Sequence, residues 1–309
     1  MSSEPVIELR GLRKSYGDHE AVRGIDLTIE RGEIFAFLGP NGAGKTTTVE
    51  ILEGFREASG GTVSVLGRNP WNAGARWRER IGIVLQESSA EGGLTVHECL
   101  TLYAGYYRHP RSVKETLALV GLEDQADQRA NKLSGGQQRR LDVALALIGD
   151  GELIFLDEPT TGFDPSARRA SWDVIAGLRD LGKTVFLTTH YMEEAERLAD
   201  RIAVIADGQI VAHGTPETLG GRDHQQSVIS FTLPDTIGVD ALPQQLAVTG
   251  ERNQTVSITT ASPTKDLNTL TGWALEQGLS LDDLKVSRPS LEDVYLSLTS
   301  ETASGKAAI

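Results

Sequence analysis

The stretch from Glu33 to Leu52 constrains the fold of this 309-residue chain more than any other. The segment EIFAFL is a nearly unbroken apolar run of strand length, which predicts a strand buried on both faces of a parallel sheet. Directly after it come three glycines, a proline and an asparagine, and then a predicted helix. Glycines allow backbone N–H groups to turn inward at a helix N-terminus, whose dipole favours anions. The stretch therefore predicts a site that binds phosphate groups.

The segment GPNGAGKT, residues 39–46, fits the P-loop pattern G-x-x-x-x-G-K-[ST]. In that pattern Lys45 reaches the β- and γ-phosphates of a nucleotide, and the Thr46 hydroxyl binds Mg²⁺. The alternative, an ordinary glycine-rich turn, does not explain why strand, full motif and helix coincide. The residues predicted to bind phosphate are Gly39, Asn41, Gly42, Gly44, Lys45, Thr46 and Thr47.

A second apolar run, LIFLDEPTTGFDP, ends in two adjacent carboxylates, Asp157 and Glu158. Ligands bind at the carboxyl edge of a parallel sheet, which places these carboxylates beside the P-loop. Asp157 is predicted to bind Mg²⁺, and Glu158 to polarise the water that attacks the γ-phosphate. A solvated strand end is the alternative, which the four preceding apolar residues disfavour.

Further runs at Thr184 and Ile202 alternate with helical segments, the clearest from Pro165 to Leu181 with Asp164 as its N-cap. This alternation predicts a wound α/β sheet. Residues Val6 to Glu30 predict a small antiparallel sheet with turns at residues 16–18 and 23–26, and a second strand pair is predicted near residues 61–66.

The chain is predicted to contain two domains. Residues 1–222 form the nucleotide-binding α/β domain, with an inserted helical subdomain at about 87–150. Residues 223–309 form a small C-terminal α+β domain, in which PSLEDVYLSL predicts a helix with Leu291, Val294, Tyr295 and Leu298 on one face and Ser290 as its cap.

Charge and composition narrow the class of partner. The net charge of −13 disfavours binding to nucleic acid or anionic lipid through bulk electrostatics. With one cysteine, Cys99, and no apolar leader at the N-terminus, the chain is expected to be cytosolic. Its longest apolar runs are too short to span a bilayer, so a membrane role requires a partner.

The segment LSGGQQRR, residues 133–140, resembles the signature motif of the ATP-binding subunits of ABC transporters. The resemblance covers about residues 6–218. It implies a P-loop NTPase core of the RecA-like type with an antiparallel β subdomain, and ATP and Mg²⁺ as cofactors. It also implies a head-to-tail homodimer, in which ATP binds between one subunit's P-loop and the other's Ser134, Gly135, Gly136 and Gln137.

The resemblance assigns four further residues. Tyr16 is similar to the aromatic residue that stacks on adenine; a tyrosine of a hairpin turn is the alternative. Gln86 resembles the glutamine that contacts Mg²⁺ and the attacking water, and His190 the switch histidine near the γ-phosphate. Asp164 resembles the loop aspartate that communicates across the dimer, which is compatible with its capping role.

The resemblance further implies a separate polytopic membrane subunit, bound near residues 87–103 through Leu94, Val96, Leu100, Leu102 and Tyr103. The same residues could instead fill the helical subdomain's own core. The chain would then lie at the cytoplasmic face of the membrane. Its length and ending, RPSLEDVYLSLT, are similar to the drug and antibiotic exporter branch of prokaryotic ABC-2 systems. The alternative function is a soluble ABC ATPase acting on ribosomes or DNA, which the acidity of the chain disfavours.

Overall fold

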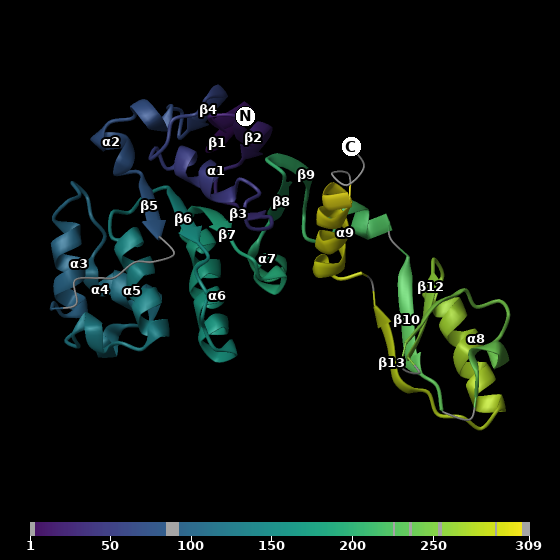
Figure 1. Ribbon diagram of the computed structural model, residues 1–309. Coiled ribbons are helices and arrows are strands. Elements are labelled where there is room, and N and C mark those ends of the chain that lie inside the picture. The colour runs from purple at the N-terminus through teal and green to yellow at the C-terminus, as the bar shows by residue number, and fades with distance from the viewer. Residues whose placement is uncertain are drawn as a thin grey trace. The chain divides into compact units, whose positions relative to one another are not determined.

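The computed structural model describes residues 4–84, 93–224, 226–234, 237–252, 255–287 and 289–304. They form two compact units, one made of residues 4–216 together with 299–304 and one spanning Glu217–Leu298. Figure 1 shows the elements of both.

An antiparallel sheet opens the first unit. Its strands are β1 (Ile7–Tyr16), β2 (His19–Ile29) and β4 (Gly60–Val65), in the order β2-β1-β4. This confirms the predicted antiparallel sheet and its turn near residue 17. The turn predicted at residues 23–26 is wrong, because β2 continues through it with Gly24 at φ 89° and the β1–β2 pairing shifts register nearby. The second strand pair near residue 61 is likewise a single strand, β4, that pairs with β1.

The central sheet has the order β5-β6-β7-β3-β8-β9. The first five strands are parallel, and β9 pairs antiparallel with β8. Their bounds are β3 (Ile34–Leu38), β5 (Ile81–Val84), β6 (Leu153–Asp157), β7 (Thr184–Thr188), β8 (Arg201–Ala206) and β9 (Gln209–Gly214). Because β6, β7 and β3 are neighbours, the segments that follow them meet at one edge of the sheet.

Both faces of the central sheet are buried, as the apolar runs predict. On one face Phe35, Phe37 and Phe155 each pack against Phe186, with ring centroids 5.6–6.0 Å apart. The alternate residues of the same strands pack into a second core with the helices. Successive side chains of a strand point to opposite faces, so continuous apolar runs serve both cores.

The helices of this unit are α1 (Lys45–Leu52), α2 (Ala75–Arg78), α3 (Val96–Ala104), α4 (Val113–Val120), α5 (Gly135–Leu147), α6 (Pro165–Asp180) and α7 (Met192–Leu198). Short 3₁₀ turns lie at Pro70–Asn72, Glu123–Gln125 and Ala130–Lys132. Figure 1 shows α3, α4 and α5 gathered beside the β5 edge of the sheet, where a helical subdomain is predicted.

The second unit has its own sheet, ordered β11-β12-β10-β13. Its elements are β10 (Ser227–Thr232), β11 (Val248–Arg252), β12 (Thr255–Thr260), β13 (Asp282–Ser287) and α8 (Pro263–Glu276), with 3₁₀ turns at Leu219–His224 and Val239–Ala241. Helix α9 (Leu291–Ser304) belongs to this unit as far as Leu298. Ile229, Phe231 and Leu270 are fully buried in a core separate from those of the first unit.

Helix α9 begins as predicted. The Ser290 hydroxyl accepts a hydrogen bond from the Asp293 backbone N–H, and the Asp293 carboxylate accepts from the Ser290 backbone N–H in return. Leu291 and Val294 are buried, whereas Tyr295 and Leu298 are half-buried. The predicted apolar face is therefore most deeply buried in its first turn.

Candidate functional site

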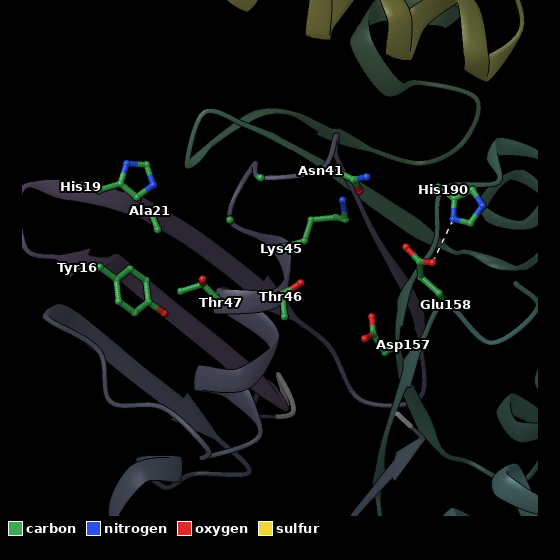
Figure 2. A pocket seen from close by; sticks show the side chains of 12 residues that line it. Tyr16, His19, Ala21, Asn41, Lys45, Thr46, Thr47, Asp157, Glu158 and His190 are labelled. Carbon is green, nitrogen blue, oxygen red and sulfur yellow. Dashed lines mark ion pairs between the residues drawn. The ribbon is translucent and has the colours of Figure 1, made fainter. Parts of the chain in front are cut away.

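A cavity of about 760 Å³ lies at the carboxyl edge of the central sheet, where β3, β6 and β7 end (Figure 2). Clefts of a few hundred to about a thousand Å³ hold small molecules and cofactors. The cavity is lined by Tyr16, His19, Ala21, Asn41, Gly42, Gly44, Lys45, Thr46, Thr47, Asp157, Glu158 and His190.

The loop between β3 and α1 requires its glycines. Gly44 precedes α1 at φ 100°, and a Cβ atom there would lie 2.5 Å from the Ala21 carbonyl oxygen. At Gly39 a Cβ atom would lie 2.3 Å from the Ile205 carbonyl oxygen. Within the described chain, no side chain caps the start of α1. The N-terminus of α1 therefore presents backbone N–H groups to the cavity, which suits phosphate oxygens.

The amine of Lys45 curls back over this loop. Its Nζ donates hydrogen bonds to the carbonyl oxygens of Gly39 at 2.5 Å and Pro40 at 3.0 Å. Burial lowers the pKa of Lys45, and the carboxylates of Glu158 and Asp157 oppose that shift. The amine thus lies between the loop and the two carboxylates, where a cation attracts phosphate.

Thr46 and Asp157 face the cavity from α1 and β6 (Figure 2). The Thr188 hydroxyl, on neighbouring β7, donates a hydrogen bond to Asp157 Oδ1. A hydroxyl and a carboxylate are hard oxygen ligands of the kind that Mg²⁺ prefers beside phosphate. These residues therefore fit a magnesium ion bound together with a nucleotide.

Glu158 is held in an unusual backbone conformation, with φ 44°. Its backbone N–H donates to the Thr188 carbonyl oxygen at 3.0 Å. Its Oε2 accepts a hydrogen bond from the Thr161 hydroxyl at 3.1 Å and lies 3.3 Å from His190 Nδ1 (Figure 2). A carboxylate fixed this way at the cavity wall can accept a proton from a water molecule.

Tyr16 lies at the opposite end of the cavity from Glu158 (Figure 2). The guanidinium of Arg56 and the amine of Lys14 lie 5.2 Å and 5.3 Å from the centre of its ring. With 41% of its surface exposed, Tyr16 can offer a ring face to a planar base. Its cross-strand partner His19 also lines the cavity.

The segment around Ser134 forms a second helix start outside this cavity. Ser134 caps α5: its hydroxyl accepts from the Gln137 backbone N–H, and Gln137 Oε1 accepts from the Ser134 backbone N–H. Among the described residues that line the cavity, none comes from 133–137. The start of α5 instead adjoins that of α6, since a Cβ atom on Gly136 would lie 3.4 Å from Ala167 Cβ. There Asp164 Oδ1 accepts hydrogen bonds from the N–H groups of Ser166 and Ala167.

Arg139, one turn into α5, reaches the strand that carries the carboxylates. Its side chain is buried, and its guanidinium donates to the main-chain oxygens of Pro159 at 3.0 Å and Asp157 at 2.6 Å. Burial lowers the pKa of Arg139, while Asp142, Asp157 and Glu194 oppose the shift. The guanidinium remains charged, because arginine does not lose its proton in proteins.

Sequence reasoning thus predicts most of the cavity's lining, and the structure brings these side chains together. Gly39 is outside the lining, although its carbonyl binds Lys45. Gln86 lies outside the described residues, so its predicted role stays a prediction. Sequence reasoning missed His19, Ala21, Thr188 and Arg139. Only His19 carried a signal, because it follows the hairpin turn directly after Tyr16.

Two family models match the chain. Residues 22–161 match the model described as ABC transporter, and residues 227–290 match the C-terminal domain of ABC transporter domain-containing proteins. Nod factor export ATP-binding protein I of Rhizobium sp. (strain N33) is 40% identical, over 96% of this chain and 98% of that protein. Its namesake from Burkholderia orbicola (strain AU 1054) is 38% identical, over 97% and 98%.

Solved structures of ATP-binding cassettes share the fold. The dimeric, post-hydrolysis structure of the cassette MJ0796 bound to ADP and Pi has a TM-score of 0.60 and 28% identity, and covers 68% of this chain and 98% of that one. CbiO1 from Clostridium perfringens, described as part of the ABC transporter complex CbiONQ, has a TM-score of 0.61 and 27% identity, over 70% and 90%. These likenesses confirm the predicted α/β P-loop fold and the resemblance drawn from the sequence.

Proposed function

The chain belongs to the ABC transporter family as an ATP-hydrolysing subunit, and from this premise we propose how its residues, its dimer and its partner serve export. Two helix starts carry the proposal. The starts of α1 and α5 both suit phosphate, yet only the first lines the described cavity. Two phosphate-binding elements for one nucleotide are redundant within one chain.

The redundancy disappears in a head-to-tail dimer. There the exposed Ser134 and Gly135 of one subunit would close over the ATP held by Lys45 of the other. Such an interface is two-fold symmetric and forms two equivalent ATP sites. ATP favours the closed dimer because it contacts both halves, and hydrolysis removes that advantage. The dimeric structure of the similar cassette MJ0796 with ADP and Pi supports the formation of a dimer.

Within each site, the side chains have distinct roles. Tyr16 stacks on the adenine, and Lys45 with the α1 N-terminus, including Asn41 and Thr47, binds the phosphates. Thr46, Asp157 and Gln86 hold Mg²⁺, which when bound neutralises charge on the phosphates. Glu158 accepts the proton of the attacking water, and His190 holds Glu158 and contacts the γ-phosphate.

Export needs a separate membrane subunit. Within the described ranges, no helix is both long and apolar enough to cross a bilayer. Val96 and Leu100 belong to the core of the helical subdomain, whereas Leu102 is 44% exposed and Tyr106 71% exposed. The exposed pair offers apolar surface for such a subunit, which would hold the chain at the cytoplasmic face of the membrane.

The relatives' names support a role in export, and they name Nod factor rather than a drug or antibiotic. We therefore propose an exporter of the ABC-2 type without assigning its substrate. We also propose residues 1–222 as the ATPase domain and 223–309 as an accessory domain, supported by the separate core of the latter. Cross-linking in cells followed by mass spectrometry tests the partner. A polytopic membrane protein recovered in near-equal amount supports the proposal, and ribosomal or DNA-repair proteins recovered alone contradict it.

Glu158→Gln tests the dimer directly. Because the amide cannot accept the proton, the variant should bind ATP with Mg²⁺ yet hydrolyse it about a hundredfold or more slowly. Closed dimers should then accumulate and appear in size-exclusion chromatography with light scattering. The same variant carrying Lys45→Ala is the control and should stay monomeric. If Glu158→Gln alone stays monomeric at saturating ATP, the head-to-tail arrangement is wrong.

A further inference from the structure

Arg139 on α5 forms hydrogen bonds with the backbone on both sides of Glu158. Arg139 Nε donates to the Pro159 carbonyl oxygen at 3.0 Å, and Arg139 Nη2 donates to the Asp157 carbonyl oxygen at 2.6 Å. These two carbonyls belong to the residues on either side of Glu158. One planar guanidinium therefore fixes the main chain on both sides of the proposed catalytic residue.

These hydrogen bonds stabilise an unusual backbone conformation, which glutamate residues rarely adopt. Its φ of 44° lies in the left-handed region, where a Cβ atom is crowded. Pro159 follows directly and disfavours the right-handed helical alternative. The Glu158 N–H is fixed from the other side by the Thr188 carbonyl oxygen at 3.0 Å. Residues in such conformations persist only where surrounding contacts over-determine them.

Arg139 is suited to transmit a displacement. It lies on the same helix as Ser134 and Gly135, one turn beyond the cap, and its side chain is buried. Asp142, one turn further along α5, lies 3.8 Å from Arg139 Nη1, within the distance of an ion pair. A rigid fork with two hydrogen bonds follows its helix more closely than a flexible lysine amine would.

We infer that Arg139 is a positioning residue, which couples the start of α5 to Glu158 of the same chain. The inference rests on the proposed function: when α5 engages the ATP held by the partner subunit, Arg139 sets the backbone of Asp157–Pro159 and so aims the Glu158 carboxylate. Residues 134–137 of each chain thus act on two ATP sites. They contact the ATP held by the partner subunit, and through Arg139 they position Glu158 at the site of their own chain.

Arg139→Lys tests the inference, with neighbouring Arg140→Lys as a matched control. Arg140 also lies on α5 and also donates to two main-chain oxygens, but those belong to Val120 and Gly121 in the helical subdomain. Arg139→Lys should lower kcat about tenfold or more and leave KM for ATP within about twofold, because a small misplacement of a catalytic group costs rate rather than binding. Arg140→Lys should lower kcat much less.

A double-mutant cycle of Arg139→Lys with Glu158→Gln distinguishes a role of Arg139 in positioning Glu158 from a general loss of structure. If Arg139 acts through Glu158, then Arg139→Lys should leave the residual hydrolysis of Glu158→Gln unchanged, to within about twofold. The double variant should also form the ATP-dependent dimer as well as Glu158→Gln alone. An equal loss of rate in both backgrounds, or a normal kcat in Arg139→Lys, overturns the inference. Failure of the parent Glu158→Gln to dimerise would instead contradict the proposed function.

Should lysine at this buried position unfold the protein, Arg139→Gln combined with Asp142→Asn replaces it, since neutralising Asp142 as well avoids leaving its carboxylate buried without the Arg139 charge. The kcat of this double variant is then divided by that of its parent, once with Glu158 intact and once with Glu158→Gln. A loss confined to the background with intact Glu158 supports the inference, and a loss in both overturns it.

Discussion

Single side chains around the cavity are positioned by groups from neighbouring strands. Thr188 on β7 holds both the side chain of Asp157, the last residue of β6, and the backbone of Glu158, which follows it. His190, just beyond β7, pairs with Glu158. The two carboxylates therefore depend on the β6–β7 register, in which Asp157 lies opposite Thr188.

The ionisation of Glu53, at the end of α1, is expected to make the stability of the protein depend on pH. It is 6% exposed, and its Oε1 has no hydrogen-bond partner among the described residues. Burial, together with repulsion from Asp157 and Glu50, raises the pKa of Glu53 from 4.5 to about 8. The folded protein retains this proton where the unfolded chain releases it. The stability that it contributes is therefore fully present below pH about 4.5 and is lost as pH rises through about 8.

Glu53→Gln should remove this dependence. Relative to the variant, the wild-type protein should lose on the order of 1 kcal/mol of unfolding free energy per pH unit between pH about 5 and 8. Denaturant titrations of both proteins at pH 5, 6.5 and 8 check this, without nucleotide and with EDTA to exclude bound cations. Parallel pH profiles for the two proteins would show that Glu53 ionises normally.

The P-loop residues could be predicted from sequence because their function is local. The loop that binds phosphate, its lysine and its helix are consecutive in the chain. Thr188 and Arg139 could not, since their contacts depend on which strands are neighbours and on where α5 packs. The roles of Gln86 and of the other predicted site residues stay predictions.

At the scale of elements, Asp164 caps α6 and is also predicted to communicate across the dimer, and mutations can separate these two roles. Its carboxylate caps α6 by accepting two backbone hydrogen bonds. Asp164→Ala should therefore lower the unfolding free energy by about 1 kcal/mol. Asp164→Ser retains a cap and should lose much less. Thermal unfolding of the three nucleotide-free proteins measures the capping role, and equal stability of all three would contradict it.

The two variants also probe the proposed contact across the dimer. If Asp164 communicates between the subunits, both variants should lower ATPase turnover, although only alanine lowers stability. If turnover falls only in Asp164→Ala, the variant that loses stability, then Asp164 acts as a helix cap and has no role across the dimer.

Elements were predictable where apolar runs and caps coincide, as in β3, β6, β7 and α6. The pattern failed at residues 23–26, because Gly24 lies within a continuous strand. It also could not separate core from surface in α3, where Val96 is buried and Leu102 exposed. That difference depends on how α3 packs against α5, and the apolar periodicity of the sequence carries no information about this packing.

At the scale of the whole molecule, the predicted family, the P-loop fold and the ATPase motor role are confirmed by the comparisons. The separate C-terminal family match over residues 227–290 agrees with a second unit. The domain boundary at residue 222 and the absence of a nucleic-acid partner stay predictions. Substrate identity could not be read from this chain, because specificity belongs to the site that contacts the substrate.

Subunit mixing tests most directly whether each ATP site is shared between two chains. Lys45→Ala removes the amine that is proposed to bind the phosphates. Gly135→Asp places a carboxylate where the partner's phosphates would lie, and a Cβ atom there meets nothing within 4 Å in the monomer. Each variant alone should be inactive. Mixed in equal amounts, they should recover hydrolysis well above that of either variant and at most about a quarter of the wild-type rate, since half the dimers are mixed and each contains one site with both Lys45 and the partner's Gly135. The rate should fall below this ceiling, because the α5 that positions Glu158 of that site carries Gly135→Asp. Activity that stays at the level of the separate variants would contradict a shared site.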